Sequence, residues 1–344
     1  MVTVKEVAKH AGVSPATVSR VIHGAQNVDP DIQRRVKRSI KELGYFPNQA
    51  ARSLVNRQMG SIAVLLRNLH NPFFMKLLAG FEEGALHSDH TVVFSSLGRE
   101  AEYRDRYIQF LSNGFTDAFI LYGTYFSDRP IIEHLLEFNF PFLLIENSFD
   151  DLPVNQLLIN NADGASIAVE YLIQKGHRRI AHFMGNPNKK VILDRMNGYM
   201  LSMRKHGLPI MPGDMISIHS EKDAAFSMAI ELMKRPPQQR PTAIFASNDR
   251  IAAKAIQGIE SMGYKVPLDI SVVGFDNQIV FDDGYTGPDI TSMRQPFFDI
   301  GRDSIDLIQG ILDRKVETPL TRMYATQLIE RDTVAGPRDF SDII

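Results

Sequence analysis

The apolar positions of the first 22 residues predict two short helices joined by a tight turn. Thr3 and Glu6 have the Thr-x-x-Glu spacing of a capping box, so we expect the first helix to begin at about Val4. Gly12 suits the left-handed residue that ends a helix, and Ser14-Pro15 suits the start of a second one. The inward residues at helical spacing are Val4, Val7, Ala8, Ala11, Val18, Val21 and Ile22.

A third helix is expected to begin at Asp29 or Asp31 and to end at Gly44. Helix-turn-helix proteins place the second helix of such an arrangement in the major groove of DNA. The apolar residues of the third helix at helical spacing are Ile32, Val36, Ile40 and Leu43.

From Gly60 onward, short apolar runs alternate with helical patterns. This alternation predicts parallel sheets covered by helices, and its two successive runs predict two doubly wound lobes. The expected strands are Ile62–Leu66, Thr91–Ser95, Ala118–Tyr122, Phe142–Ile145, Gln156–Ile159, Arg179–Met184, Met215–His219, Ala243–Ala246 and Ile270–Phe275. The expected helices include Phe73–His87, Glu102–Asn113, Ala162–Lys175, Arg195–His206, Ala224–Lys234 and Arg250–Met262.

Composition narrows the class of protein. A length of 344 residues predicts two or three domains, at about 100–200 residues each. The absence of cysteine excludes disulfides, thiolate metal sites and cysteine nucleophiles, and permits a cytoplasmic location. No apolar run approaches the ~20 residues of a membrane helix, and the N-terminus lacks the apolar core of a signal peptide. We therefore expect a cytoplasmic protein without a membrane partner.

The net charge of −2 is unevenly distributed. Residues 1–59 contain ten Lys and Arg against four Asp and Glu, a net charge of +6, so residues 60–344 carry −8. A basic segment on an acidic body predicts a polyanionic partner for that segment alone, and the coincidence with a helix-turn-helix pattern favours DNA over a merely solvated helix face.

The outward face of the second predicted helix suits base recognition. Pro15 and Ala16 are small and allow close approach to base edges, and Arg20 can donate two parallel hydrogen bonds to a guanine. The hydroxyls of Thr17 and Ser19 suit phosphate oxygens. The alternative is a plain three-helix bundle with an exposed arginine.

A short helix of about two turns is predicted after Pro47-Asn48. It is too short to be stable alone in water, so it suits a segment that folds on binding DNA. Leu54 would then be an apolar wedge at a minor-groove base step. The alternative is a linker with an incidental leucine.

These segments closely resemble the lactose-repressor (LacI/GalR) family of bacterial transcription regulators. The resemblance rests on the Val-Ser-x-Ala-Thr-Val-Ser-Arg-Val core at residues 13–21 and the Pro-Asn-x-x-Ala-Arg-x-Leu segment at residues 47–54, and it extends to about residue 335. It implies that Pro15, Ala16 and Arg20 contact the major groove and that Leu54 inserts at the centre of a palindromic operator. It also implies a homodimer.

The family resemblance further implies a two-lobed body similar to the periplasmic sugar-binding proteins, with three crossings between the lobes. The expected crossings lie near Asn160–Asp163, Asp289–Ser292 and Leu320–Tyr324. The expected domains are a helix-turn-helix head at 1–46, a hinge at 47–59, an effector-binding and dimerisation body at 60–335 and a short tail at 336–344. Within the body, the N-lobe is expected at 60–160 plus 292–320 and the C-lobe at 163–289 plus 324–335. The tail lacks a leucine heptad, so no tail-mediated tetramer is expected.

Ligands of doubly wound folds bind beyond the carboxyl ends of the strands, so the cleft between two lobes is the expected effector site. The resemblance assigns effector contacts to Arg195, Asn248 and Asp276, places Phe73 and Phe74 at effector or lobe contacts, and matches Glu146 more loosely. Asn248 and Asp249 can instead cap a helix, and Phe74 can belong to the core.

Asp194 is expected to pair with the adjacent Arg195 and to tune the affinity for the effector. Together with Asp276 it would repel an anion, which favours a neutral mono- or oligosaccharide. Carboxylate, amide and guanidinium groups bond adjacent sugar hydroxyls in pairs, and aromatic faces cover the sugar ring.

The sequence contains no phosphate-binding loop, dinucleotide fingerprint or nucleophile elbow, and no histidine pair at metal-ligand spacing. We therefore predict no catalytic residues, no metal and no cofactor. The leading hypothesis is a sugar-responsive transcription regulator, most simply a repressor. The alternatives are a solute-binding protein for transport and a sugar-active enzyme with an appended DNA-binding head.

Overall fold

The computed structural model contains two compact units, Met1–Met59 and Gly60–Ile344, and each is described here by itself. Residues 47–58, which include Leu54, and most of the predicted helix Glu102–Asn113 lie outside the described residues. The described residues are 2–22, 25, 27–45, 59–67, 72–96, 106, 108–109, 111–112, 114–123, 125–149, 151–218, 224–278 and 284–338.

The first unit contains the three predicted helices, α1 (Val4–Ala11), α2 (Pro15–Ile22) and α3 (Pro30–Glu42). Thr3 and Glu6 form the predicted capping box, and Gly12 ends α1 with a φ of 64°. The Ser14 hydroxyl accepts a hydrogen bond from the N–H of Thr17 at 3.1 Å. Asp29, the first of the two alternatives, caps α3. The helices enclose a small core of Val7, Ala8, Ala11, Val18, Val21, Val28, Val36 and Tyr45.

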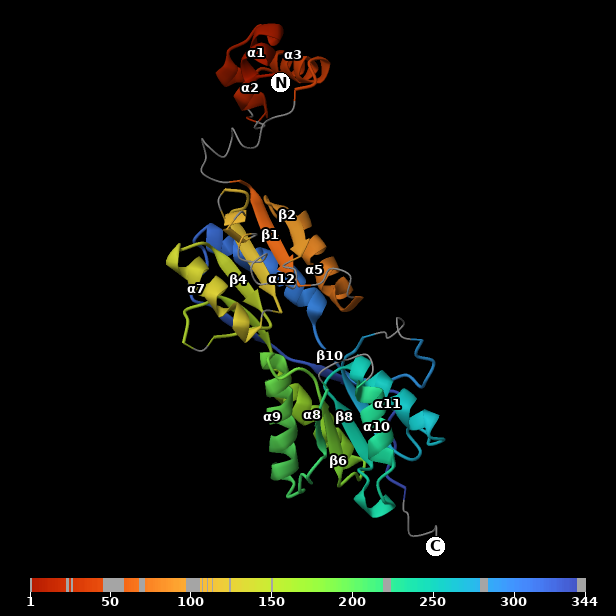
Figure 1. Cartoon of the computed structure of the whole chain (residues 1–344). Coiled ribbons are helices and arrows are strands. Elements are labelled where there is room, and N and C mark those ends of the chain that lie inside the picture. The colour runs from red at the N-terminus through yellow and green to blue at the C-terminus, as the bar shows by residue number, and fades with distance from the viewer. Residues whose placement is uncertain are drawn as a thin grey trace. The chain divides into compact units, whose positions relative to one another are not determined.

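The first lobe of the body is built on a parallel sheet with strand order β11-β5-β4-β3-β1-β2. Figure 1 labels β1, β2 and β4 of this lobe. Apolar side chains of α5 and α12 cover one face of this sheet, and those of α7 contribute to the other. The strands are β1 (Ser61–Leu66), β2 (Thr91–Ser96), β3 (Ala118–Tyr122), β4 (Phe142–Ile145), β5 (Gln156–Ile159) and β11 (Thr321–Tyr324). The helices are η1 (Pro72–Phe74), α5 (Met75–Leu86), η2 (Phe126–Asp128), α7 (Arg129–Glu137) and α12 (Phe297–Leu312).

The second lobe has the strand order β12-β10-β9-β8-β6-β7, in which β12 alone is antiparallel to its neighbour. Side chains of α10 and α11 cover one face and those of α8 and α9 cover the other. The strands are β6 (Ile180–Met184), β7 (Met215–Ser217), β8 (Ala243–Ala246), β9 (Ser271–Asp276), β10 (Thr291–Arg294) and β12 (Gln327–Ile329). The helices are α8 (Asn161–Gln174), α9 (Lys190–Lys205), α10 (Ala224–Met233), η3 (Pro237–Gln239) and α11 (Asp249–Ser261).

The crossings between the lobes differ in detail from the expectation. The first follows β5 at Asn160, inside the expected range. The second lies at Gln295-Pro296, because residues 291–294 pair with β9 and so belong to the second lobe. The third lies at Ala325-Thr326, because residues 321–324 pair with β5 in the first lobe. The expected second crossing was therefore a few residues too early, and the third directly follows its expected range.

The start of α9 is the largest error in the bounds of the predicted helices that the structure describes, whereas α7 and α12 were not among the predicted helices. The helix begins at Lys190 rather than at Arg195, so Asp194 and Arg195 lie within it and not before it. The N-cap residue Lys189 makes no side-chain cap hydrogen bond. The sequence therefore carries no capping signal at this point, and the start could not be found from it.

Close helix contacts position the elements that bear the cavity. At Gly198 of α9, an added Cβ atom would lie 2.0 Å from the carbonyl oxygen of Ala162 in α8. At Gly301 of α12, it would lie 2.3 Å from the carbonyl oxygen of Leu77 in α5. Both helix pairs therefore approach each other at backbone distance, which only glycine permits at these positions.

Candidate functional site

The predicted DNA-contacting residues lie on the outward face of α2. Pro15, Ala16 and Arg20 are exposed, whereas Val18 and Val21 of the same helix are buried. Thr17 and Ser19 are half-buried. The Thr17 hydroxyl lies 2.8 Å from that of Ser14. Thr17, which is predicted to contact a phosphate, is thus hydrogen-bonded to the residue before α2. Exposed cations of α3 add positive charge to the same unit, namely Arg34, Arg35, Lys37, Arg38 and Lys41.

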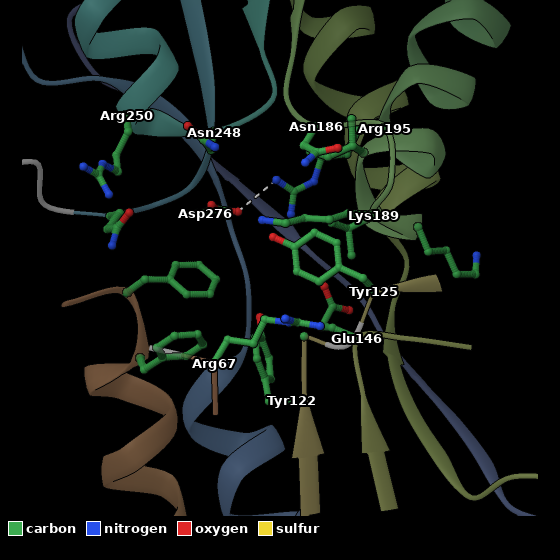
Figure 2. A pocket seen from close by; sticks show the side chains of 17 residues that line it. Arg67, Tyr122, Tyr125, Glu146, Asn186, Lys189, Arg195, Asn248, Arg250 and Asp276 are labelled. Carbon is green, nitrogen blue, oxygen red and sulfur yellow. Dashed lines mark ion pairs between the residues drawn. The ribbon is translucent and has the colours of Figure 1, made fainter. Parts of the chain in front are cut away.

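A cavity of about 250 Å³ lies between the two lobes of the body. Figure 2 shows side chains of both lobes converging on it. Several of these residues directly follow strands, as expected for ligand sites of doubly wound sheets. The predicted effector residues that line the cavity are Phe73, Phe74, Glu146, Arg195, Asn248 and Asp276.

Arg195 is fixed by contacts on several sides. It is 4% exposed, and its Nη1 lies 3.1 Å from Oδ1 of Asp276 (Figure 2). Its Nε donates to Oδ1 of Asn161 at 2.8 Å, and its guanidinium lies 3.7 Å from the ring centre of Phe275. Asp276 has a φ of 97° and also accepts a hydrogen bond from Gln295. These contacts orient a guanidinium and a carboxylate together at the edge of the cavity.

Glu146 is a buried carboxyl group at the end of β4, with a φ of 62°. It accepts hydrogen bonds from the Ile159 N–H at 2.8 Å and from the Asn161 amide at 3.2 Å. Burial raises the pKa of Glu146 from its ordinary value of 4.5 to about 7, although the charge of Arg195 and the Ile159 hydrogen bond oppose this change. Near neutral pH the group therefore exists in both protonation states, and it can accept or donate a hydrogen bond.

Asn248 both caps α11 and lines the cavity. Its Oδ1 accepts the N–H of Ile251 at 2.8 Å, which leaves the amide end toward the ligand space. Asp249 is buried and accepts hydrogen bonds from the Ser292 hydroxyl and the Gln278 N–H, both at 2.6 Å. Burial and the nearby charge of Asp276 raise the pKa of Asp249 well above its ordinary value. Asp249 thus connects β10 with the loop after β9. The residue that caps α11 is its neighbour, Asn248.

Aromatic rings cover the first-lobe side of the cavity. The ring centres of Phe73 and Phe74 lie 5.2 Å apart, and Phe74 lies 5.0 Å from Tyr122. Phe74 is 7% exposed and packs in the core of the first lobe. It is therefore mainly a core residue, which was one of its two predicted roles. Phe73 is half-buried and presents more of its ring.

Asp194 differs from its predicted place as an effector residue paired with Arg195. It does not line this cavity, and its carboxylate lies 2.9 Å from Nζ of Lys190, one turn earlier on α9, rather than pairing with Arg195. The expected pair was wrong because the two neighbours point to different sides of one helix.

Several lining residues were missed from the sequence. Arg67 directly follows β1 and Tyr125 lies shortly after β3, so the rule that ligands bind at strand ends could have found both. Lys189 had no sequence signal, because the start of α9 was misplaced. The other missed residues include Tyr122, Asn186, Lys190, Arg250 and Gln278.

Two further observations concern the described part of the chain alone. No helix in it is long and apolar enough to cross a membrane. No group of three or more histidine, aspartate or glutamate side chains in it is arranged to bind a metal ion.

Comparison with known proteins agrees with the motifs. Residues 3–48 match the family of bacterial regulatory proteins called the lacI family, and residues 169–334 match a periplasmic binding protein-like domain. The chain is 31% identical over 344 residues to the ribose operon repressor of Halalkalibacterium halodurans, a match that covers 98% of each chain.

Solved structures show the same fold. The lac repressor dimer bound to operator and the anti-inducer ONPF has a TM-score of 0.83 and 26% identity, and the match covers 97% of this chain and 99% of that one. The transcriptional regulator CelR in complex with cellobiose has a TM-score of 0.73 and 27% identity, and covers 97% and 100%. The chain therefore belongs to the LacI family and is a DNA-binding transcriptional repressor of that family.

Proposed function

We propose that this repressor binds a palindromic operator as a homodimer, with one head on each half-site. Pro15, Ala16 and Arg20 contact base edges in the major groove, and Thr17 and Ser19 contact phosphates. Support comes from the exposure of the first three residues on α2 and from the basic face of α3. A two-fold dimer matches the two-fold symmetry of a palindrome.

The hinge contributes a second contact in this proposal. Leu54 inserts as an apolar wedge into a minor-groove step at the centre of the operator. This residue lies outside the described part of the chain, so its role rests on the sequence and the family resemblance.

The effector in our proposal is a saccharide bound in the cavity between the lobes. The observation that carries this proposal is the combination of planar polar groups, Glu146, Arg195 and Asp276, with the aromatic rings of the first lobe around one space. Such groups bond sugar hydroxyls in pairs. A volume of about 250 Å³ lies just below the usual range of ligand sites, roughly 300–1,000 Å³, and so favours a monosaccharide-sized ligand. A ribose operon repressor and a cellobiose-bound regulator are among the relatives.

Effector binding would change DNA binding by shifting the balance between open and closed arrangements of the two lobes. Asn161, immediately after the first crossing, contacts Glu146 of the first lobe and Arg195 of the second. A ligand that contacts both of these residues changes the free-energy difference between open and closed lobes, and this difference controls the hinges.

The decisive experiment is a genomic DNA selection with the full-length protein at moderate salt, followed by affinity measurements with and without a panel of saccharides. We expect enrichment of one palindromic site and a change in operator affinity with at least one sugar. Failure to enrich a palindrome would refute the operator proposal. Recovery of chemically altered sugar after incubation would show an enzyme instead of a sensor.

A further inference from the structure

Two cations from opposite lobes meet at one aromatic ring of the cavity. The guanidinium of Arg67, after β1, lies 4.2 Å from the ring centre of Tyr125, and Nζ of Lys189, at the start of α9, lies 5.3 Å from it. Figure 2 shows Tyr125 between these two side chains. We propose that this end of the cavity binds an anionic group, a phosphate or a carboxylate, carried by the effector. The inference rests on the proposed function, since it specifies the ligand of the same cavity.

Among the described residues, the ion pairs around the cavity leave Lys189 without a counterion. Arg67 pairs with the buried Asp128, Lys190 with Asp194, and Arg195 with Asp276. Lys189 makes no ion pair with any residue that the structure describes, although it lines the cavity and is half-buried. A partly desolvated ammonium without a counterion is stabilised by an anion that binds to it, and the charge of Arg67 across the Tyr125 ring adds to the attraction.

Arg67 also retains an unused donor. Its Nη2 bonds to Asp128, but its Nε is buried and has no hydrogen-bond partner among the described residues. Buried N–H groups without acceptors are rare in native proteins. Because this Nε is closed to solvent, Arg67 adds positive charge to this end of the cavity, and Lys189 is the cation that contacts the anion in our proposal.

The start of α9 adds positive potential from the backbone. Lys189 is the N-cap of this helix and offers no side-chain cap, while Lys190 and Val191 of the first turn line the cavity. The first N–H groups of a helix lack intrahelical acceptors, and the helix dipole places partial positive charge there. Helix N-termini bind anions for this reason, which reinforces the side-chain cations.

The acidic groups of the cavity do not cancel this potential. Asp276 is engaged with Arg195, and Glu146 has a pKa raised by burial to about 7, so it is partly protonated at neutral pH. The expectation of a neutral ligand relied on repulsion from Asp194 together with Asp276. Asp194 lines an adjoining pocket instead of this cavity, and it pairs with Lys190. The arrangement therefore favours a phosphorylated sugar or a sugar acid over a neutral sugar.

The test compares Lys189→Met with a matched control, Lys265→Met, in the full-length protein. Methionine keeps the length of the side chain and removes its charge. Lys265 is exposed on the loop after α11 and is not a cavity residue. Inorganic phosphate is the first probe, titrated against chloride at constant ionic strength, with the melting temperature as the readout. Phosphate is expected to raise the melting temperature of the wild type and of K265M, and to raise that of K189M much less. The urea midpoint in chloride checks that K189M is folded.

The second probe distinguishes the two sources of negative charge. Ribose and glucose are compared with their terminal phosphates and with ribonate and glucuronate by calorimetry. An anionic sugar should bind more tightly than its neutral parent, and K189M should lose about 10-fold to 100-fold of that affinity, the range of a charge-assisted hydrogen bond. Preference for the phosphates or for the acids identifies the anionic group.

Two results would overturn the inference. One is equal phosphate stabilisation of K189M and K265M, which places the anion elsewhere, including on the basic head. The other is a neutral sugar that binds as tightly as its anionic derivatives. Either result leaves operator selection unaffected, so failure of this inference is distinguishable from failure of the proposed function.

Discussion

Replacing Glu146 by glutamine should make the protein more stable, relative to the wild type, at high pH than at low pH. The pKa of Glu146 is about 7 in the folded protein and ordinarily 4.5. Ionisation therefore costs the folded state about 3 kcal/mol, at about 1.4 kcal/mol for each tenfold change in proton affinity. The sign follows from the raised pKa. The group stabilises the fold fully below pH 4.5, and this contribution is lost as pH rises from about 4.5 to about 7.

Glutamine has no such titration, so the free energy of unfolding of E146Q minus that of the wild type should rise with pH. We expect the difference to increase by about 2–3 kcal/mol between pH 5 and pH 8. Any constant effect of the amide on the hydrogen bonds from Ile159 and Asn161 cancels in this comparison. The slope alone therefore tests the assignment.

Urea unfolding of the full-length protein at four pH values measures this slope. The chain contains no tryptophan, so circular dichroism at 222 nm is the suitable signal. Glu82→Gln, at an exposed position of α5, is the matched control and should give a flat difference. Parallel curves for E146Q and the wild type between pH 5 and pH 8 would refute the argument that burial raises the pKa of this group.

Three further predictions concern the DNA-binding residues and the helix packing. Arg20→Ala should cost about 1–3 kcal/mol of operator affinity and relax the preference at one base pair, which a selection on randomised half-sites would detect; an unchanged base preference would contradict the groove contact. Leu54→Ala should weaken specific binding and reduce DNA bending in a gel-shift assay, while helical content stays intact; full retention of both affinity and bending would contradict the wedge. Gly198→Ala should destabilise the protein by about 1–3 kcal/mol in urea, because the methyl group meets the Ala162 carbonyl oxygen; wild-type stability would show that α8 and α9 can separate at little cost.

Strands buried on both faces were predictable almost to the residue. β3, β4 and β8 match the predicted bounds, because continuous apolar runs are typical of central strands in doubly wound sheets. The edge strand β11 was not predicted, since its residues are mostly exposed and carry no apolar pattern. It exists because its backbone pairs with β5 across a long separation in sequence. Such pairing is a tertiary property, so local patterns do not show it.

The same distinction between local patterns and tertiary contacts applies to the residues of the cavity. Arg195 and Asp276 matched the motif of a known family, and Glu146 and Asn248 follow strands, so sequence could nominate them. The partners of these groups could not be predicted. Asp194 was paired with the wrong cation, because the predicted start of α9 left Lys190 and Asp194 outside the helix, whereas they lie one turn apart on it.

The position of β11 determines when the first lobe can be completed. β5 ends at Ile159 and its sheet neighbour β11 begins at Thr321, about 160 residues later. At roughly 5–20 residues per second, a ribosome needs about 8–32 s to synthesise that interval. Throughout that time the nascent first lobe lacks its edge strand, and for most of it also α12, one of the helices that cover its sheet. The nascent protein thus exposes an unpaired strand edge until Thr321–Tyr324 has been synthesised, and its yield should depend on translation speed and on chaperones at the ribosome.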